Sequence, residues 1–441
     1  MMPTRQNSAT CFLFLLLVTF GIACADEPQG LGALAMAEFS RPSLLGRFDS
    51  NQDGHLDAAE RKSLRAAFGG IDVPMLPMRP DRYTLGNGPK HVAFSQLSEL
   101  DNTGKDNSIS NAGATLGRVL FYEKLLSKNN TTACASCHLQ EKAFADPRRF
   151  SIGFKGDRTG RNSMSLGNGR FTIVNGSSPG FFWDERAVTL EDQALMPIED
   201  KIEMGMKLTD LEQKLRRLPY YPLLFAAAFG PNEVTNDGIA KALAQFMRSL
   251  VSFNSKFDRA ADAVGGNDYS QDFDDFTPEE NLGKSLFIDG VGNIAELGCA
   301  HCHVPPSFGM PRSFNNGLEL QYADQGLGAR DVPSNAPFTP TNDGKFKASS
   351  LRNIALTGPY MHDGRFNTLQ QVIEHYSSGV HRHANLEIAI DEEEGAIGKG
   401  PSGFRLTRKQ KSALVAFLKT LTDEEFISDP RFSDPFVRLD D

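Results

Sequence analysis

The sequence predicts a mainly α-helical protein in which a small N-terminal module precedes two larger helical domains. Three observations predict this organisation: capping boxes followed by apolar residues at helical spacing, two copies of a C-x-x-C-H motif far apart in the chain, and an acidic twelve-residue loop near the N-terminus. We place the boundaries at 1–25 for a leader, 26–80 for the module and its linker, 81–270 for the first domain and 271–441 for the second.

The leader is predicted from Arg5, an apolar run over residues 12–22, and Ala23-Cys24-Ala25, which has the small-x-small form of a signal-peptidase site. The mature chain then begins near Asp26, and the expected location is the bacterial periplasm. An alternative is a lipoprotein anchored at Cys24, which Gly21 disfavours because leucine is usual there. Cys11 and Cys24 both fall in the leader, so cleavage leaves no free thiol outside the two motifs.

Composition restricts the partners of the mature chain. The formal net charge is −9 and the isoelectric point is about 5.6, which argues against nucleic acid because phosphate binding needs a basic face. No second apolar run is long enough to span a bilayer, so no membrane span is expected. The acidic surface is either plain solvated surface or a docking face for a basic electron-donor protein.

The first element of the mature chain is a loop over residues 49–60 that fits the EF-hand template. Oxygen donors stand at the diagnostic positions, glycine at the sixth and glutamate at the twelfth, with the histidine contributing its backbone carbonyl. The predicted calcium ligands are Asp49, Asn51, Asp53, His55, Asp57 and Glu60. An acidic turn with a helix cap is the alternative. A single EF-hand favours a structural over a switching role for calcium.

Prolines between Pro74 and Pro80 and a turn at 86–89 separate this module from the helical domains. Capping boxes predict helix starts at Thr209 with Glu212, Thr277 with Pro278 and Glu280, Thr368 with Gln371, and Thr407 with Gln410. Two apolar stripes at helical spacing predict core faces, Ile239, Leu243, Phe246, Leu250 and Phe257 in one and Leu414, Phe417, Leu418 and Leu421 in the other.

The C-x-x-C-H motifs are the chemical centre of the sequence. Each sets two thiols one turn apart, where they can add across the vinyl groups of a haem, and the histidine that follows can reach the iron. The residues are Cys134, Cys137 and His138 in the first motif and Cys299, Cys302 and His303 in the second. A zinc site would use the same four cysteines, but it needs no histidine after each pair and prefers closer pairs. Two covalent c-type haems are therefore predicted.

Four segments, 116–146, 151–166, 181–206 and 351–376, resemble the bacterial di-haem cytochrome c peroxidase family and, within it, the MauG-like branch. The resemblance extends from about Leu116 to Pro435. It implies two cytochrome c-like domains with a calcium ion between them, a peroxide-reacting N-terminal haem and an electron-storing C-terminal haem.

The sixth iron ligands distinguish the branches. The ordinary peroxidases have a distal histidine in a Ser-Ile-Gly-His loop, and the resemblance places Phe154 there; residues 92–270 contain no histidine except His138. We expect an open, five-coordinate N-terminal haem, unless a methionine or a rearranged loop fills the position.

At the C-terminal haem, Tyr376 stands where the peroxidases have methionine. Helical spacing also places it on one face with Leu369, whereas His375 points off that face. A core tyrosine is the alternative.

Further roles are implied by the resemblance alone. Glu203 matches the distal acid-base, Gln193 the hydrogen-bond donor to the bound oxidant, and Pro197 the residue that shapes the pocket. Trp183, the only tryptophan, matches the relay between the haems, although a buried structural aromatic is the alternative. The inter-haem calcium ligands correspond to Asn162, Thr357 and Pro359.

Two positions depart from the family pattern. Glu185 replaces a glycine beside the relay, and Leu297 stands where the MauG branch has a second tryptophan on the route to its protein substrate. Long-range oxidation of a docked protein by that route is therefore in doubt.

We predict a periplasmic di-haem oxidoreductase that uses hydrogen peroxide to oxidise an external substrate, such as a partner protein, through high-valent iron. The nearer alternative is a cytochrome c peroxidase that receives electrons from a small cytochrome or cupredoxin. A non-enzymatic electron carrier would need six-coordinate irons, which Phe154 disfavours. A calcium-sensing scaffold is disfavoured because the EF-hand is unpaired.

Overall fold

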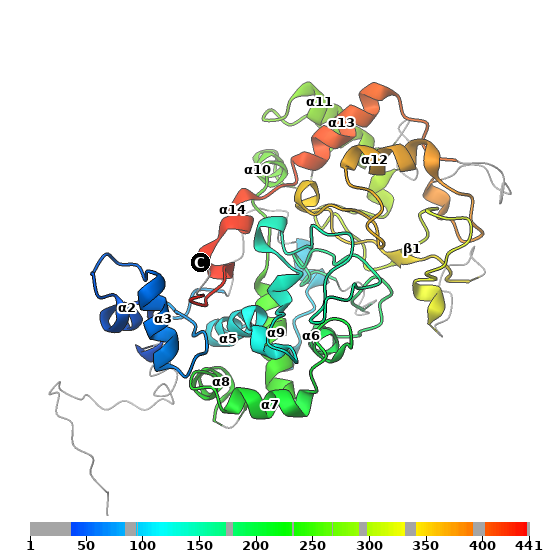
Figure 1. The fold of residues 1–441 in the computed structure, drawn as a ribbon. Helices are drawn as coiled ribbons and strands as arrows, with labels where there is room; N and C mark the ends of the chain where they lie inside the picture. The colour runs from blue at the N-terminus through cyan, green and yellow to red at the C-terminus, as the bar shows by residue number, and fades with distance from the viewer. Residues whose placement is uncertain are drawn as a thin grey trace, which may run out of the picture.

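A computed structural model describes residues 37–83, 94, 96–172, 180–231, 233–266, 268–290, 298–330, 341–390 and 402–438. Helices dominate this part of the chain, as predicted, and its sheet is a single pair of two-residue strands. Figure 1 shows a small module with α2 and α3, a central group from α5 to α9, and a third group from α10 to α13. The predicted leader lies outside the described residues.

The helices are α2 Arg41–Phe48, α3 Ala58–Ala67, α5 Asn111–Tyr122, α6 Leu190–Glu199, α7 Leu208–Arg216, α8 Tyr221–Phe229, α9 Asn236–Ser249, α10 Lys256–Ala263, α11 Pro278–Ile288, α12 Leu369–Glu374, α13 Arg408–Lys419 and α14 Glu424–Ser428. The two strands, β1 Ser313–Phe314 and β2 Phe346–Lys347, pair antiparallel. Short 3-10 turns and long loops connect these elements.

Three of the four predicted capping boxes are confirmed, at Thr277, Thr368 and Thr407. The fourth is wrong, because α7 begins at Leu208 and Thr209 lies inside its first turn. The Glu212 carboxylate instead accepts a hydrogen bond of 2.7 Å from the backbone N–H of Asn236, at the start of α9. The capping box is absent because Lys207, and not Thr209, is the N-cap residue of α7.

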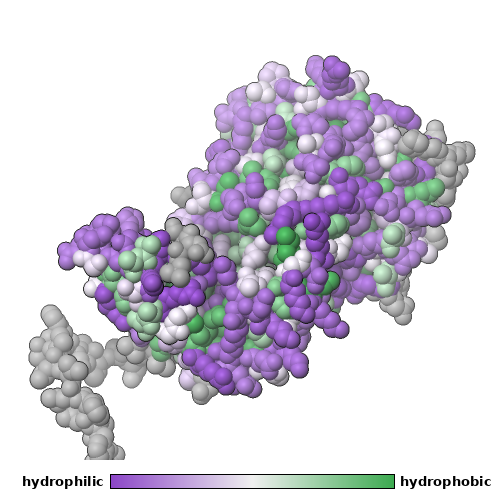
Figure 2. All heavy atoms as spheres, in the orientation of Figure 1, coloured by the Kyte–Doolittle hydropathy of each residue, from purple (hydrophilic) through white to green (hydrophobic). Residues whose placement is uncertain are grey.

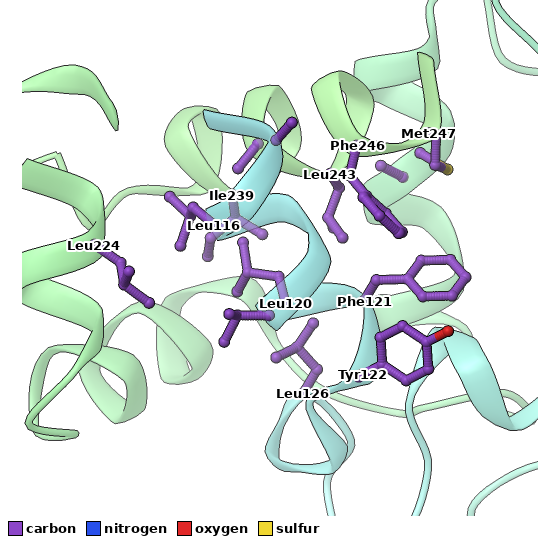
Figure 3. Close-up of a cluster of buried hydrophobic side chains, with 14 of the residues drawn as sticks. Leu116, Leu120, Phe121, Tyr122, Leu126, Leu224, Ile239, Leu243, Phe246 and Met247 are labelled. Atoms are coloured by element: carbon purple, nitrogen blue, oxygen red, sulfur yellow. The ribbon is translucent and has the colours of Figure 1, made fainter. Parts of the chain in front are cut away.

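The first core is built where α5 crosses α9. Leu116, Leu120 and Phe121 from α5 meet Leu243 and Phe246 from α9, and all five are buried (Figure 3). The predicted stripe on α9 is therefore a core face. Its last member, Phe257, departs from the prediction: α9 ends at Ser249, Ser255 caps the new helix α10, and Phe257 packs into the second core.

The second core repeats the first, because α11 crosses α13 as α5 crosses α9. In both crossings a glycine allows the helix backbones to approach closely. A Cβ atom at Gly117 would overlap the carbonyl oxygen of Ala242, and one at Gly283 would overlap that of Ala413. The flanking sequences, Leu-Gly-Arg-Val-Leu-Phe at 116–121 and Leu-Gly-Lys-Ser-Leu-Phe at 282–287, are similar. The two halves thus share one helix-pair architecture.

The C-terminal segment returns to the first half of the chain. Phe426, Phe432 and Phe436 belong to the first core, although the sequence boundary assigned residues 271–441 to the second domain. Figure 1 shows α14 passing beside the central group. The N-terminal module is attached there too, since the N–H of Met75 donates to the carbonyl of Pro435 over 2.7 Å.

The surface in Figure 2 is mainly hydrophilic, with scattered apolar residues. Within the described residues, no helix has both the length and the apolar character that a membrane crossing requires.

Candidate functional site

The first motif begins in a 3-10 turn, Cys134–Ser136, and places His138 on the wall of a cavity of about 430 Å³. The Nδ1 atom of His138 lies 2.8 Å from the carbonyl oxygen of Phe144. A carbonyl oxygen only accepts, so Nδ1 carries the proton and Nε2 keeps its lone pair. Burial lowers the pKa of His138, which also favours the neutral ring. This is the state a metal-ligating histidine needs.

The second motif has the same geometry. Cys299–His301 forms a 3-10 turn, and Nδ1 of His303 lies 3.1 Å from the carbonyl oxygen of Phe308. Burial lowers the pKa of His303 to about 4. Cys299, Cys302 and His303 line a second cavity of about 230 Å³. The four motif cysteines form no disulfide, so both places fit a c-type haem.

The three predicted distal residues meet at the first cavity. Gln193 and Pro197 come from α6, which Thr189 and Asp192 cap, and Glu203 follows shortly after that helix. Burial raises the pKa of Glu203 to about 7, and the nearby Asp200 carboxylate adds to the shift. A carboxyl group that titrates near neutral pH can both accept and return a proton.

Phe154 is not among the residues that line the first cavity. Its buried ring rests on Gly205, where a Cβ atom would overlap it, and its N–H donates to the carbonyl of Glu203 over 3.0 Å. The loop over 151–159 therefore packs against the segment that carries Glu203. His91, which also falls in the predicted first domain, lies outside the described residues.

Tyr376 faces the second cavity together with Leu369, Val372 and Ile373, as the helical spacing predicted. The helix differs in detail, because α12 gives way to a π-helical turn over His375–Gly379. His375 does not line the cavity; its Nε2 lies 3.0 Å from the carbonyl oxygen of Asn316. The amide of Asn316 donates to the Tyr376 hydroxyl over 3.3 Å.

Trp183 borders both cavities and is the aromatic residue that the two linings share, beside residues such as Asn162 and Met164. Its indole N–H donates to the carbonyl of Asn162 over 2.8 Å. Glu185 has positive φ and accepts a hydrogen bond of 2.6 Å from the Ser313 hydroxyl. Burial raises the pKa of Glu185. Glu185, two residues after Trp183, is thus held in place by Ser313, whereas Leu297 lies outside the described residues.

Asn162, Thr357 and Pro359 all line the second cavity. The N–H of Asn162 donates to the carbonyl of His362 over 2.7 Å, which ties the two segments together. Together they supply oxygen atoms of the kind that calcium prefers.

The predicted EF-hand loop lies between α2 and α3. The Gly54 N–H donates to Asp49 over 2.9 Å, and Asp57 and Glu60 form the capping box of α3. A hydrogen bond from Ser50 lowers the pKa of Glu60 to about 2. Within the described residues, no group of three or more His, Cys, Asp or Glu side chains is gathered as a metal site. Calcium binding by this loop stays a prediction.

Asn316 and Lys347 border the cavities but belong to no motif recognised in the sequence. Asn316 lies shortly after β1 and Lys347 is the last residue of β2, so both belong to the region of the small strand pair, and only the tertiary structure brings them to the cavities.

Two adjacent cavities, each bordered by the histidine of a C-x-x-C-H motif and both bordered by Trp183, define a di-haem c-type redox protein. A family model described as di-haem cytochrome c peroxidase matches residues 111–264. The methylamine utilization protein MauG of Methylophilus methylotrophus is 33% identical over 71% of this chain and 84% of its own. Cytochrome c551 peroxidase of Nitrosomonas europaea is 31% identical over 71% and 80%.

Among solved structures, a MauG-like protein associated with microbial copper homeostasis is 35% identical, with a TM-score of 0.61, over 79% of this chain and 98% of that one. The chain belongs to the di-haem cytochrome c peroxidase family. It is therefore a haem enzyme of the peroxidase class.

Proposed function

We propose that this chain is a MauG-like, periplasmic di-haem enzyme that uses hydrogen peroxide to oxidise an external substrate, with aromatic side chains of a partner protein as the substrate class. Support for the proposal comes from the two residues that the family resemblance assigns to the sixth-ligand positions. Phe154 packs on Gly205 and cannot ligate iron, and Tyr376 faces the second cavity.

Haem bound at both motifs would supply the redox chemistry; His138 and His303 would ligate the two irons, and Tyr376 would give the C-terminal haem a second protein ligand. A phenolate is a hard anionic donor that favours the higher oxidation states of iron. This ligand suits a site that stores an oxidising equivalent. In the cavity, the Asn316 amide orients the phenol oxygen.

In the first cavity, the carboxylate of Glu203 accepts the proton of the inner peroxide oxygen and returns it to the outer oxygen. The outer oxygen leaves as water, and the bound haems would supply the two electrons that this cleavage consumes. The pKa of Glu203, about 7, allows both proton transfers near neutral pH. Gln193 donates a hydrogen bond to the oxidant. Pro197 offers no ligating atom and keeps other ligands out. Trp183 relays electrons between the two sites, since its ring borders both cavities.

We assign calcium a structural role at two places. The loop over 49–60 would hold one ion between α2 and α3. Asn162, Thr357 and Pro359 would hold another at the wall of the second cavity, the last two through their carbonyl oxygens. Neither ion takes part in the proposed proton transfer.

The competing function is a cytochrome c peroxidase, which reduces peroxide to water with electrons from a small cytochrome or cupredoxin. The similarity to cytochrome c551 peroxidases favours it. One experiment separates the two: stoichiometric peroxide is added to the fully oxidised, calcium-loaded protein, and the optical and near-infrared spectra are followed. A rapid, long-lived oxidised species that Tyr376→Phe cannot hold supports the MauG-like function. No reaction until one haem is reduced would contradict the MauG-like function and favour the cytochrome c peroxidase.

A further inference from the structure

Four permanently or potentially cationic side chains other than histidine border the two cavities: Arg161, Arg186, Arg352 and Lys347. The three arginines are paired with carboxylates at 2.7–2.9 Å, namely Arg161 with Asp184 and Asp324, Arg186 with Asp184, and Arg352 with Asp258. Their charges are therefore compensated by the protein.

Lys347 differs from these arginines. Its ammonium donates one hydrogen bond, of 2.7 Å, to the carbonyl of Gly180, and within the described residues no carboxylate lies within 4 Å of it. Glu185 is the acidic residue whose charge acts on Lys347, but its carboxylate already accepts a hydrogen bond from the Ser313 hydroxyl. Burial of the amine lowers the pKa of Lys347 to about 8, and the opposing charge of Glu185 only partly offsets this effect.

An ammonium group has three N–H donors, and a desolvated cation is costly unless an anion offsets it. Lys347 borders both cavities, so an anion inside either one could reach it. The two haem propionates are carboxylates of the required charge. Among the described residues that line the second cavity, Lys347 is the only lysine or arginine.

We propose that Lys347 binds a propionate carboxylate of the C-terminal haem. The inference rests on haem attachment at the second motif, which is part of the proposed function, but it does not depend on peroxide chemistry. The ion pair would lie against Trp183, because the backbone N–H of Lys347 donates to the Trp183 carbonyl over 2.9 Å. Lys347 would then set the charge beside both the relay and the storing haem.

The test is a redox titration of the haem-loaded protein without peroxide, in which the two midpoint potentials are resolved by optical and electron paramagnetic resonance spectra. Lys347→Met removes the charge and keeps the backbone hydrogen bond to Trp183. An uncompensated propionate stabilises ferric iron, so the C-terminal midpoint potential should fall. Lys347→Arg keeps the charge and should stay near the parent value.

Lys345→Met is the matched control, because Lys345 is a buried lysine close by that lines neither cavity. It should leave both potentials unchanged. Haem content and circular dichroism confirm that each variant is intact, with Lys347→Gln as the substitute if Lys347→Met does not fold. An unchanged C-terminal potential in an intact variant, or a shift confined to the N-terminal haem, overturns the assignment. Loss of peroxide reactivity alone would bear on the proposed function and not on this ion pair.

Discussion

The side-chain amide of Asn316 donates a hydrogen bond to the hydroxyl of Tyr376 over 3.3 Å, and the same nitrogen lies 3.5 Å from the sulfur of Met361. The carbonyl of Asn316 also accepts from Nε2 of His375 over 3.0 Å. Asn316 therefore contacts both the π-helical turn that contains Tyr376 and the hydroxyl oxygen of Tyr376, the atom that would ligate the iron.

Asn316→Leu should remove the hydrogen bond that orients the Tyr376 hydroxyl, while the Tyr376 side chain stays in the second cavity. Without the amide donor, the phenolate donates more charge, so the spectrum of the C-terminal haem should shift and its midpoint potential should fall. The lost hydrogen bond should also destabilise the fold by about 1 kcal/mol. Electron paramagnetic resonance and thermal unfolding measure these effects, with Tyr376→Phe as the reference for full ligand loss. A C-terminal haem spectrum identical to the parent would show that Asn316 has no influence on the ligand.

Glu203→Gln should lower kcat/KM for peroxide by about 10²- to 10⁴-fold, because the amide cannot shuttle the proton. Burial raises the pKa of Glu203 to about 7, so the carboxylate is fully present only above that pH and is lost as the pH falls. The rate in the parent should therefore fall about tenfold per pH unit below 7, and the variant should lack this dependence. Stopped-flow traces at several pH values measure it.

Glu199→Gln is the control for that change, since Glu199 is an exposed carboxylate at the end of α6 that does not line the cavity. It should react as the parent does. An unchanged pH profile in Glu203→Gln would assign the titration to another group.

Trp183→Phe should distinguish two steps: the reaction with peroxide, and the transfer of the oxidising equivalent between the two haems. Phenylalanine keeps an aromatic ring at the wall but is much harder to oxidise, and the hydrogen bond to the Asn162 carbonyl is lost. We expect peroxide still to be consumed, while oxidation no longer reaches the C-terminal haem. Time-resolved spectra of both haems test this. If peroxide consumption stops as well, Trp183 acts in the pocket and not as a relay.

Glu60→Gln tests the calcium loop. Glutamine can still form the capping box of α3, so the variant removes the charged ligand and retains the helix start. Calcium that binds only the folded chain raises its melting temperature, and this increase should largely vanish in the variant. Calorimetry with calcium and with chelator measures it. The same increase in both proteins would exclude the loop as the stabilising site.

Gly283→Ala should destabilise the second core. The new Cβ would overlap the carbonyl of Ala413 at the α11–α13 crossing, and overpacking of this kind costs about 1–3 kcal/mol. Gly46→Ala in α2 is the matched control, because nothing lies within 4 Å of its added Cβ. The control should be neutral or slightly stabilising. Equal melting temperatures for the two variants would contradict the close crossing.

Local sequence was sufficient for features whose chemistry is contained in a few consecutive residues. The haem-attachment turns, three of the four helix starts, the core face of α9 and the orientation of Tyr376 were all predicted in this way. The predictions failed for side chains that contact a segment distant in the sequence and not their own helix. Glu212 caps another helix, and Phe257 belongs to the next helix and the other core.

The sequence by itself determined the two C-x-x-C-H motifs, because they depend only on residue identity and short spacing, and its resemblance to the family predicted the residues at the sixth-ligand positions. Tertiary structure alone decided that Trp183 borders both cavities, that Asn316 reaches Tyr376, and that Lys347 borders both cavities without a carboxylate within 4 Å in the described part of the chain. These three facts depend on how the long loops fold over the helices. The course of these loops is set by hydrogen bonds and packing between segments that are distant in the sequence. No local sequence pattern predicts such contacts.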